Sequence, residues 1–338
     1  MTVALASSPR QEHTARSLDR LRHHLGDALL AVLTQPGLIE LSVNPDGSVW
    51  ADRLGQDGMQ RVGSIESQRV ELFITATAAT LGLCIDRRSL PVLSAELPAG
   101  EPWRGARLQA WLPPLASAPC FSLRMHASAV FTLADYEARR IMSADQRRAI
   151  EAAVAARQNI LVVGETASGK STLLNAILAH VGETAPLDRF LILEDTTEIQ
   201  CASANAVQLH TSGAVDMDEL LRTCMRARPD RIVVGEVRGK EALTFVKALG
   251  TGHTGYCTIH AGSALGGLQR LEACIQEASI TPQREQIAAA LDLIVVIRRD
   301  PKATAGRCVR EVLALDSVLS ASGGYVLDPA PSAQEHAR

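Results

Sequence analysis

Hydrophobic positions in the second half of the chain form short apolar runs, and segments with helical periodicity separate them. Apolar runs of this kind are typical of strands buried on both faces of a sheet, and the periodic segments are typical of helices covering those faces. The strands expected from this alternation are 160–163, 190–193, 232–234, 256–259, 293–297 and 309–315. The pattern predicts an α/β domain over residues 143–320, built on a largely parallel core sheet.

The first 130 residues show shorter apolar segments and more turn residues. A helical stripe at Leu18, Leu21, Leu25, Leu29 and Val32 ends before a Pro-Gly pair. Strands expected at 38–43 and 48–51 flank Asn-Pro-Asp-Gly, which predicts a hairpin. A further helix is expected near 66–81, and strands at 107–112 and 121–126. These elements predict a smaller α+β domain over residues 1–130, with residues 1–14 disordered.

The boundary between the two parts is predicted from capping and composition. Residues 131–142 are interpreted as a linker that could contain one short helix. Ser143 followed by Gln146 is a capping-box pattern, so a helix should begin there and run to about Arg157. Residues 321–338, rich in Pro, Ala, Ser and Gly, are expected to be a peripheral or disordered tail.

One segment carries a specific chemical signal. Residues 164–171 read GETASGKS and fit G-x-x-x-x-G-K-[ST], between a predicted buried strand and a predicted amphipathic helix. In such a P-loop, backbone N–H groups and the helix N-terminus bind phosphate, the lysine reaches the β- and γ-phosphates, and the hydroxyl ligates Mg²⁺. The motif predicts ATP and Mg²⁺ as cofactors and a RecA-like P-loop NTPase fold. The candidate nucleotide-binding residues are Gly164, Glu165, Thr166, Ala167, Ser168, Gly169, Lys170, Ser171 and Thr172.

Acidic side chains follow two of the predicted strands. The run at 190–193 leads into Glu194-Asp195-Thr196-Thr197-Glu198, and the run at 232–234 leads to Glu236. Carboxylates at the C-terminal edge of such a sheet lie where Mg²⁺ and the attacking water bind, and Glu236 could order or deprotonate that water. A solvated strand end is the alternative interpretation of the first acidic group. The candidate Mg²⁺ ligands are Ser171, Glu194 and Glu236, the two glutamates directly or through water.

Histidines and arginines supply further candidates. His253 and His260 bracket a short predicted strand beside glycine-rich residues, which favours a role near the phosphate site. Metal binding by these histidines is not expected, because no third or fourth ligand occurs at suitable spacing. Arg222 and Arg226 lie four residues apart on a helix predicted to begin after Asp216. They have two interpretations, solvated surface residues or a phosphate-sensing or subunit contact.

Composition excludes several classes of protein. The net charge is −3, from 34 basic and 37 acidic residues, so bulk electrostatics give no reason to expect a nucleic-acid partner. The 7 cysteines form no C-x-x-C pair, so we expect buried thiols rather than disulfides or a four-cysteine zinc site. No apolar run approaches the roughly 18 residues of a membrane span, and no export signal is visible. We therefore expect a cytoplasmic protein whose membrane contact, if any, is peripheral.

Taken in order, four segments resemble the sequence motifs of the type II and type IV secretion ATPase superfamily. GETASGKS, LEDTTE, RARPDRIVVGEVRG and GTGHTGYCTIHAGSA are similar to its Walker A motif, Asp box, Walker B motif and His box. Residues 105–110 and 121–124 resemble the type IV branch, in particular conjugative-transfer ATPases. The resemblance covers about residues 15–318. It implies a hexameric ring, ATP bound between two domains, and peripheral attachment at the cytoplasmic face of the inner membrane. It also implies partners among inner-membrane secretion-channel components and a coupling protein, for pilus biogenesis or substrate translocation.

The resemblance also assigns roles to individual residues. It implies that Lys170 and Ser171 bind phosphate and Mg²⁺. Glu194 matches the Asp-box acid, Glu236 the Walker B acid and His260 the His-box residue. One departure is Ala167, where relatives often have glycine. Two arginines of the first domain are expected to approach the nucleotide, with surface solvation as the alternative. The residues implied to be catalytic are Lys170, Glu194, Glu236, His260, Arg107 and Arg124.

We therefore expect a Mg²⁺-dependent ATPase that drives conjugative transfer or type IV secretion by nucleotide-driven domain motion. One alternative is a type IV pilus or type II secretion motor, and the missing four-cysteine zinc module argues against the type II version. Another is a RecA-like motor that translocates nucleic acid, which the balanced charge disfavours, so direct nucleic-acid binding is not implied. A third is a nucleotide-gated scaffold with negligible turnover, which the intact acid set makes a weaker candidate.

Overall fold

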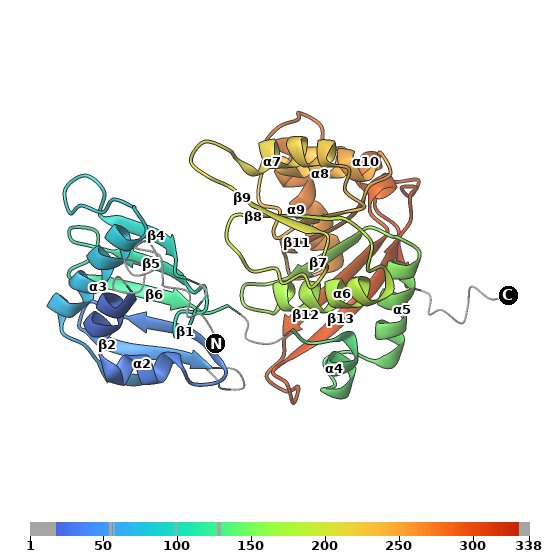
Figure 1. Cartoon of the computed structure of the whole chain (residues 1–338). Coiled ribbons are helices and arrows are strands. Elements are labelled where there is room, and N and C mark those ends of the chain that lie inside the picture. The colour runs from blue at the N-terminus through green and yellow to red at the C-terminus, as the bar shows by residue number, and fades with distance from the viewer. Residues whose placement is uncertain (1–17, 54–55, 57, 99, 127–129, 331–338) are drawn as a thin grey trace, which may run out of the picture. The chain divides into compact units, whose positions relative to one another are not determined.

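The computed structural model describes residues 18–53, 56, 58–98, 100–126 and 130–330. The chain divides into two compact units, Met1–Ser128 and Ala129–Arg338 (Figure 1). The disorder expected for residues 1–14 concerns positions outside the described residues, as does the end of the expected tail, 331–338. Each unit has a sheet of its own, and the two are described separately below.

The first unit is built on an antiparallel sheet of 6 strands in the order β3-β2-β1-β6-β5-β4. The predicted hairpin is confirmed, because β1 and β2 pair antiparallel across the Asn-Pro-Asp-Gly turn. The predicted strands near 107 and 121 are also present and pair with each other. The strands are β1 (Leu38–Val43), β2 (Ser48–Arg53), β3 (Gln60–Ser64), β4 (Val92–Glu96), β5 (Arg107–Trp111) and β6 (Cys120–Arg124).

Helices pack on this sheet through an apolar core. Helix α3 (Ser67–Thr80) buries Val70, Phe73 and Ile74 against residues of the strands. The predicted N-terminal helical stripe is interrupted, because Gly26 has φ 77° and separates helical residues 18–25 from α2 (Asp27–Leu33). A positive φ cannot continue a right-handed helix, so the helix is interrupted at Gly26, and both pieces contribute leucines to the core.

The second unit contains a sheet of 8 strands in the order β14-β13-β12-β7-β11-β10-β8-β9. The strands from β12 to β9 in this order are parallel, and β13 and β14 extend the sheet antiparallel at one edge. All of the strands predicted for this domain are present. The strands are β7 (Ile160–Gly164), β8 (Phe190–Glu194), β9 (Ala206–His210), β10 (Arg231–Val234), β11 (Thr254–His260), β12 (Leu293–Arg299), β13 (Arg307–Leu315) and β14 (Leu327–Pro329).

Helices cover both faces of this sheet, as the fully apolar strands require. Alternate residues of β7 illustrate the arrangement: Ile160 and Val162 belong to one core, and Leu161 and Val163 to the other. The first core contains α4 (Leu133–Ala138), α5 (Ala144–Ala155) and α6 (Lys170–Thr184). The second contains α7 (Met217–Cys224), α8 (Glu241–Leu249), α9 (Ala264–Gln276) and α10 (Arg284–Ala290) (Figure 1). Together with the first unit, this arrangement confirms the predicted fold class.

Two segments differ from expectation. Within residues 131–142, helix α4 has a Thr132 capping box and buries Leu133 and Tyr136 in the core beside α5 and α6, so this segment belongs to the second unit rather than to a linker. In the expected tail, β14 pairs with β13, because Leu327 and Tyr325 have an apolar surface to pack against. The local amino-acid composition gave no sign that either segment packs against the rest of the second unit.

The cysteines are all free thiols, as predicted, but only some are buried. Cys120, Cys224, Cys257 and Cys274 are buried, whereas Cys84 is exposed. Burial raises the pKa of the Cys224 thiol to about 11. Within the described ranges, no helix combines the length and the apolar character that crossing a bilayer requires.

Candidate active site

The P-loop lies between the C-terminal end of β7 and the start of α6. Gly169 precedes the helix with φ 101°, a conformation that side chains with a Cβ rarely adopt. A Cβ on Gly164 would lie 2.4 Å from Ser168 Oγ and 2.5 Å from the carbonyl oxygen of Ile297. The first and last glycines of the motif are therefore required by the backbone, and the loop directs the N-terminus of α6 toward the C-terminal edge of the sheet.

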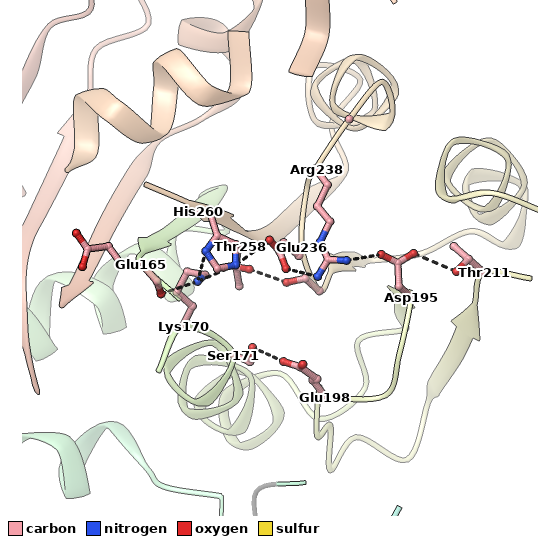
Figure 2. Close-up of polar contacts among 12 residues, drawn as sticks. Glu165, Lys170, Ser171, Asp195, Glu198, Thr211, Glu236, Arg238, Thr258 and His260 are labelled. Carbon is pink, nitrogen blue, oxygen red and sulfur yellow. Dashed lines mark hydrogen bonds and ion pairs between the residues drawn. The ribbon is translucent and has the colours of Figure 1, made fainter. Parts of the chain in front are cut away.

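Lys170 is buried at the start of α6, with 7% of its surface exposed. Its Nζ donates to the Glu165 carbonyl oxygen at 3.0 Å and lies 3.3 Å from each ring nitrogen of His260 (Figure 2). His260 ends β11, and the parallel register pairs it with Gly164, the first residue of the loop. The neighbouring strands therefore bring together two predicted residues that are 90 positions apart in the sequence.

Glu236 follows β10, the next strand in the sheet, and its carboxylate has two partners. Glu236 Oε1 is 3.0 Å from His260 Nε2, and Oε2 accepts from Arg238 Nη2 at 2.6 Å. The imidazole of His260 thus lies between the Lys170 ammonium and the Glu236 carboxylate (Figure 2). A carboxylate beside a P-loop, held by Arg238 and His260 and 19% exposed, can accept a hydrogen bond from a water at that edge.

Arg238 was not among the predicted site residues, although it lies two positions after Glu236. Its Nη1 is 3.2 Å from Asp195 Oδ2, and Asp195 Oδ1 accepts from the Thr211 hydroxyl at 3.0 Å. The hydrogen bond to Glu236 raises the pKa of Arg238 above its usual range, so this guanidinium stays charged. Arg238 therefore connects residues that follow β10 and β8, and Asp195 extends the network to Thr211 after β9. The signal in the sequence was its position two residues after the Walker B acid.

The acidic segment after β8 places Glu194 and Glu198 differently. Glu194 is 2% exposed, and its Oε1 accepts from the backbone N–H groups of Glu198 at 2.9 Å and Ile199 at 2.8 Å. Glu198 Oε2 accepts from the Ser171 hydroxyl at 2.8 Å. In this structure Glu194 shapes the turn, while Glu198 faces the predicted Mg²⁺ residue. Glu198 was visible as the last carboxylate of LEDTTE, but its direction depends on the turn.

The residues at this edge fit a Mg²⁺–nucleotide ligand. The two glycines let the loop pack closely against its own side chains and against Arg307, and the buried Ser168 Oγ has no hydrogen-bond partner among the described residues. Ser171 and Glu198 offer hard oxygen donors next to the start of α6. Among the described residues, no group of three or more His, Cys, Asp or Glu could hold a metal by itself. Mg²⁺ with phosphates needs no such group, because it takes few protein carboxylates and several ligand oxygens.

Arg107 and Arg124 belong to the first unit. They lie directly opposite each other on β5 and β6, and the same row across the sheet continues to Glu40 on β1 and Glu96 on β4. Arg107 is half-buried and Arg124 exposed. Opposite charges in a cross-strand row stabilise a sheet, which is a structural use for both arginines. Their approach to the nucleotide stays a prediction.

Two other candidates lie away from the P-loop edge. His253 precedes β11 and contacts Thr251 Oγ1 at 3.2 Å, whereas His260 ends that strand, so the strand length separates the two histidines. The expectation that both flank the phosphate site is wrong for His253, because β11 is continuous between them. Arg222 is exposed and pairs with Asp218 at 2.8 Å, which agrees with its interpretation as a surface residue.

Comparison with known proteins agrees with this geometry. The family model described as Type II/IV secretion system protein matches residues 105–322. The conjugal transfer protein TrbB of Rhizobium radiobacter is 45% identical over 89% of this chain and 91% of its own length. The probable conjugal transfer protein TrbB of Sinorhizobium fredii is 43% identical over 93% of each chain.

A solved structure shows the same fold at lower identity. The X-ray structure of the Legionella pneumophila ATPase DotB has a TM-score of 0.56 and 18% identity, and covers 96% of this chain and 81% of that chain. The match over residues 105–322 spans the P-loop, the acids and His260. The chain belongs to the Type II/IV secretion system protein family.

Proposed function

We propose that this protein is a Mg²⁺-dependent ATPase that powers conjugative transfer through a type IV secretion system. The observation that carries the proposal is the row formed by Lys170, His260, Glu236 and Arg238 at the C-terminal ends of β7, β11 and β10. The process is inferred from the conjugal transfer proteins that share 45% and 43% of their residues with this chain over nearly its full length.

The proposed chemistry follows from the positions of the side chains. Bound Mg²⁺ would offset the negative charge between the β- and γ-phosphates. Lys170, now donating to Glu165, would donate to phosphate oxygens instead, and Ser171 would exchange Glu198 for the metal. Glu236 would order the attacking water. His260 Nε2 lies 3.0 Å from Glu236 Oε1 and would keep that carboxylate oriented.

Backbone groups complete the proposed nucleotide site. As in other P-loops, backbone N–H groups of residues 165–172 at the start of α6 would bind phosphate oxygens. Glu194 would act through the turn that it holds or through a Mg²⁺-bound water, because its Oε1 accepts the backbone N–H groups of Glu198 and Ile199.

Motion of the two units is the proposed output. Arg107 and Arg124 of the first domain would bind the γ-phosphate and lose that partner after hydrolysis, so the domains close and open with the nucleotide state. A guanidinium suits this role because it is planar and permanently charged. The domain boundaries proposed are those of the two compact units, 1–128 and 129–338.

We further propose assembly and location. A homo-hexameric ring would work at the cytoplasmic face of the inner membrane, with secretion-channel components and a coupling protein as partners. The names of the relatives support a role within a secretion system. The net charge of −3 supports a protein partner over direct nucleic-acid binding.

The first test is Lys170→Ala. Removing the ammonium should abolish ATP hydrolysis, because it takes away the charge that compensates the β- and γ-phosphates. Phosphate release and thermal unfolding are measured together, and the melting temperature should stay within a few degrees because a truncated side chain at a loop–helix junction leaves the core intact. Normal turnover in a folded variant would remove the P-loop from the mechanism.

The process and the ring need separate tests. In donor cells lacking this gene, the wild-type chain should restore plasmid transfer and the Lys170→Ala variant should not; loss of pilus retraction or of type II secretion with normal transfer would favour the rival motor instead. Light scattering with Mg²⁺ and an ATP analogue should give about six times the chain mass of 36.1 kDa. A monomer at micromolar concentration in every nucleotide state would contradict the ring.

A further inference from the structure

The P-loop contains one strained backbone position. Ala167 has φ 57°, in the left-handed region, although it carries a Cβ. Most L residues avoid this region because the Cβ approaches the following carbonyl oxygen, and glycine does not. An alanine held there, next to the phosphate site, indicates that surrounding groups stabilise the conformation.

The hairpin formed by β12 and β13 surrounds this loop with arginines. Arg299 Nε donates to the carbonyl oxygen of Ala167 at 3.2 Å. Arg298 Nη2 lies 3.7 Å from Glu165 Oε1. Arg307, the cross-strand partner of Arg299, has its Nη1 2.6 Å from where a Cβ on Gly169 would be. One hairpin therefore places arginines beside the loop at Glu165, Ala167 and Gly169.

These contacts differ in how strongly they constrain the backbone of the loop. The Arg298–Glu165 pair joins two exposed side chains that can both rotate, so it constrains the backbone little. Arg299 donates to a backbone carbonyl, and the direction of that carbonyl depends on the φ and ψ angles of the loop itself. Its contact is therefore the one that favours the left-handed conformation of Ala167.

We propose that Arg299 is a positioning residue for ATP hydrolysis: its hydrogen bond to Ala167 holds the P-loop in the conformation that receives the phosphates. The inference rests on the proposed role of this loop as the nucleotide site. Without the bond, an alanine at this position leaves the left-handed region for part of the time, and only the remaining fraction of molecules binds nucleotide. The apparent dissociation constant rises in inverse proportion to that fraction.

The test uses the full-length protein and compares the KM for ATP with kcat. Arg299→Ala should raise the KM and the dissociation constant of a fluorescent ATP analogue about three- to tenfold, with kcat within about twofold, because loss of one exposed charge-assisted bond changes a population and not the chemistry. Arg299→Lys should behave similarly, since an ammonium keeps the charge but lacks the fixed Nε–H. Arg310→Ala removes the same charge from an exposed position of the same hairpin and serves as the control.

A second-site substitution tests the strain directly. Ala167→Gly allows a positive φ without a Cβ, so Arg299→Ala in the glycine background should change the KM less than about twofold. Equal KM effects in the alanine and glycine backgrounds would overturn the proposal, as would an unchanged KM in Arg299→Ala. A parallel fall in kcat and melting temperature with constant KM would also overturn it and indicate a structural role only. Lys170→Ala separates a failure of the proposed nucleotide site from a failure of this inference. If Lys170→Ala hydrolyses ATP normally, the proposed nucleotide site is wrong. If Lys170→Ala is inactive while the Arg299 variants behave as the wild type, only the role of Arg299 is wrong.

Discussion

Replacing Glu236 with glutamine is the substitution that separates chemistry from folding at this site. Glu236 has two neighbours, His260 at 3.0 Å and Arg238 at 2.6 Å, and the amide keeps one acceptor oxygen for one of them. The contact with Arg238 joins a side chain that is 19% exposed to one that is 54% exposed, so its loss costs about 1 kcal/mol or less. For a unit of this size that corresponds to a fall of about 2–4 °C in melting temperature.

The effect on turnover should be far larger. A carboxylate that orders or deprotonates the attacking water contributes roughly 10²- to 10⁴-fold, and an amide cannot accept the proton. Glu236→Gln should therefore bind ATP normally and lose at least about a hundredfold in kcat. Phosphate release, equilibrium binding of a fluorescent nucleotide and thermal unfolding are measured on the same preparation.

A matched variant removes the other carboxylate partner of Arg238. Asp195→Asn breaks the contact at 3.2 Å while leaving Glu236 in place, so its kcat should stay within about tenfold of the wild type. If Glu236→Gln binds ATP and retains more than about a tenth of the wild-type kcat, the assignment of Glu236 to the water is refuted. If both variants lose the same hundredfold, the network around Arg238, not the carboxylate of Glu236, controls turnover.

Two further predictions concern stability and the first domain. Asp188→Asn should lower the stability by about 3 kcal/mol and the melting temperature by about 6–12 °C, because it leaves Arg231 as an uncompensated buried charge. Arg231 is 2% exposed and lies 2.8 Å from Asp188. Arg157→Ala removes the exposed partner of Asp188 at 2.7 Å and should cost less than about 1 kcal/mol in the same thermal scan. Alanine at Arg107 or Arg124 should lower turnover about ten- to a thousandfold with little recovery by lysine. An isolated 143–320 fragment that hydrolyses ATP at the full-length rate would instead assign those arginines to the sheet alone.

Elements with a strong local pattern could be predicted from the sequence. The strands buried on both faces were visible as apolar runs, and the helices after Ser143 and Asp216 from their capping residues. Strand β9 was missed because its residues are half-buried or exposed, and β14 because it is a short edge strand containing proline. Both strands pair with an outer strand of the sheet, and a local sequence pattern cannot show that such a strand is free to pair.

The sequence by itself determined the P-loop, because its residues are consecutive and their conformation follows from glycine, lysine and the helix that starts there. It also marked Glu236 and His260 as polar ends of apolar strands. Tertiary structure alone decided that Glu198, rather than Glu194, contacts Ser171, and that Arg238 and Arg299 join the site. The physical reason is strand order: β7 lies between β11 and β12, so residues distant in the chain meet at one sheet edge in a way that local periodicity cannot specify.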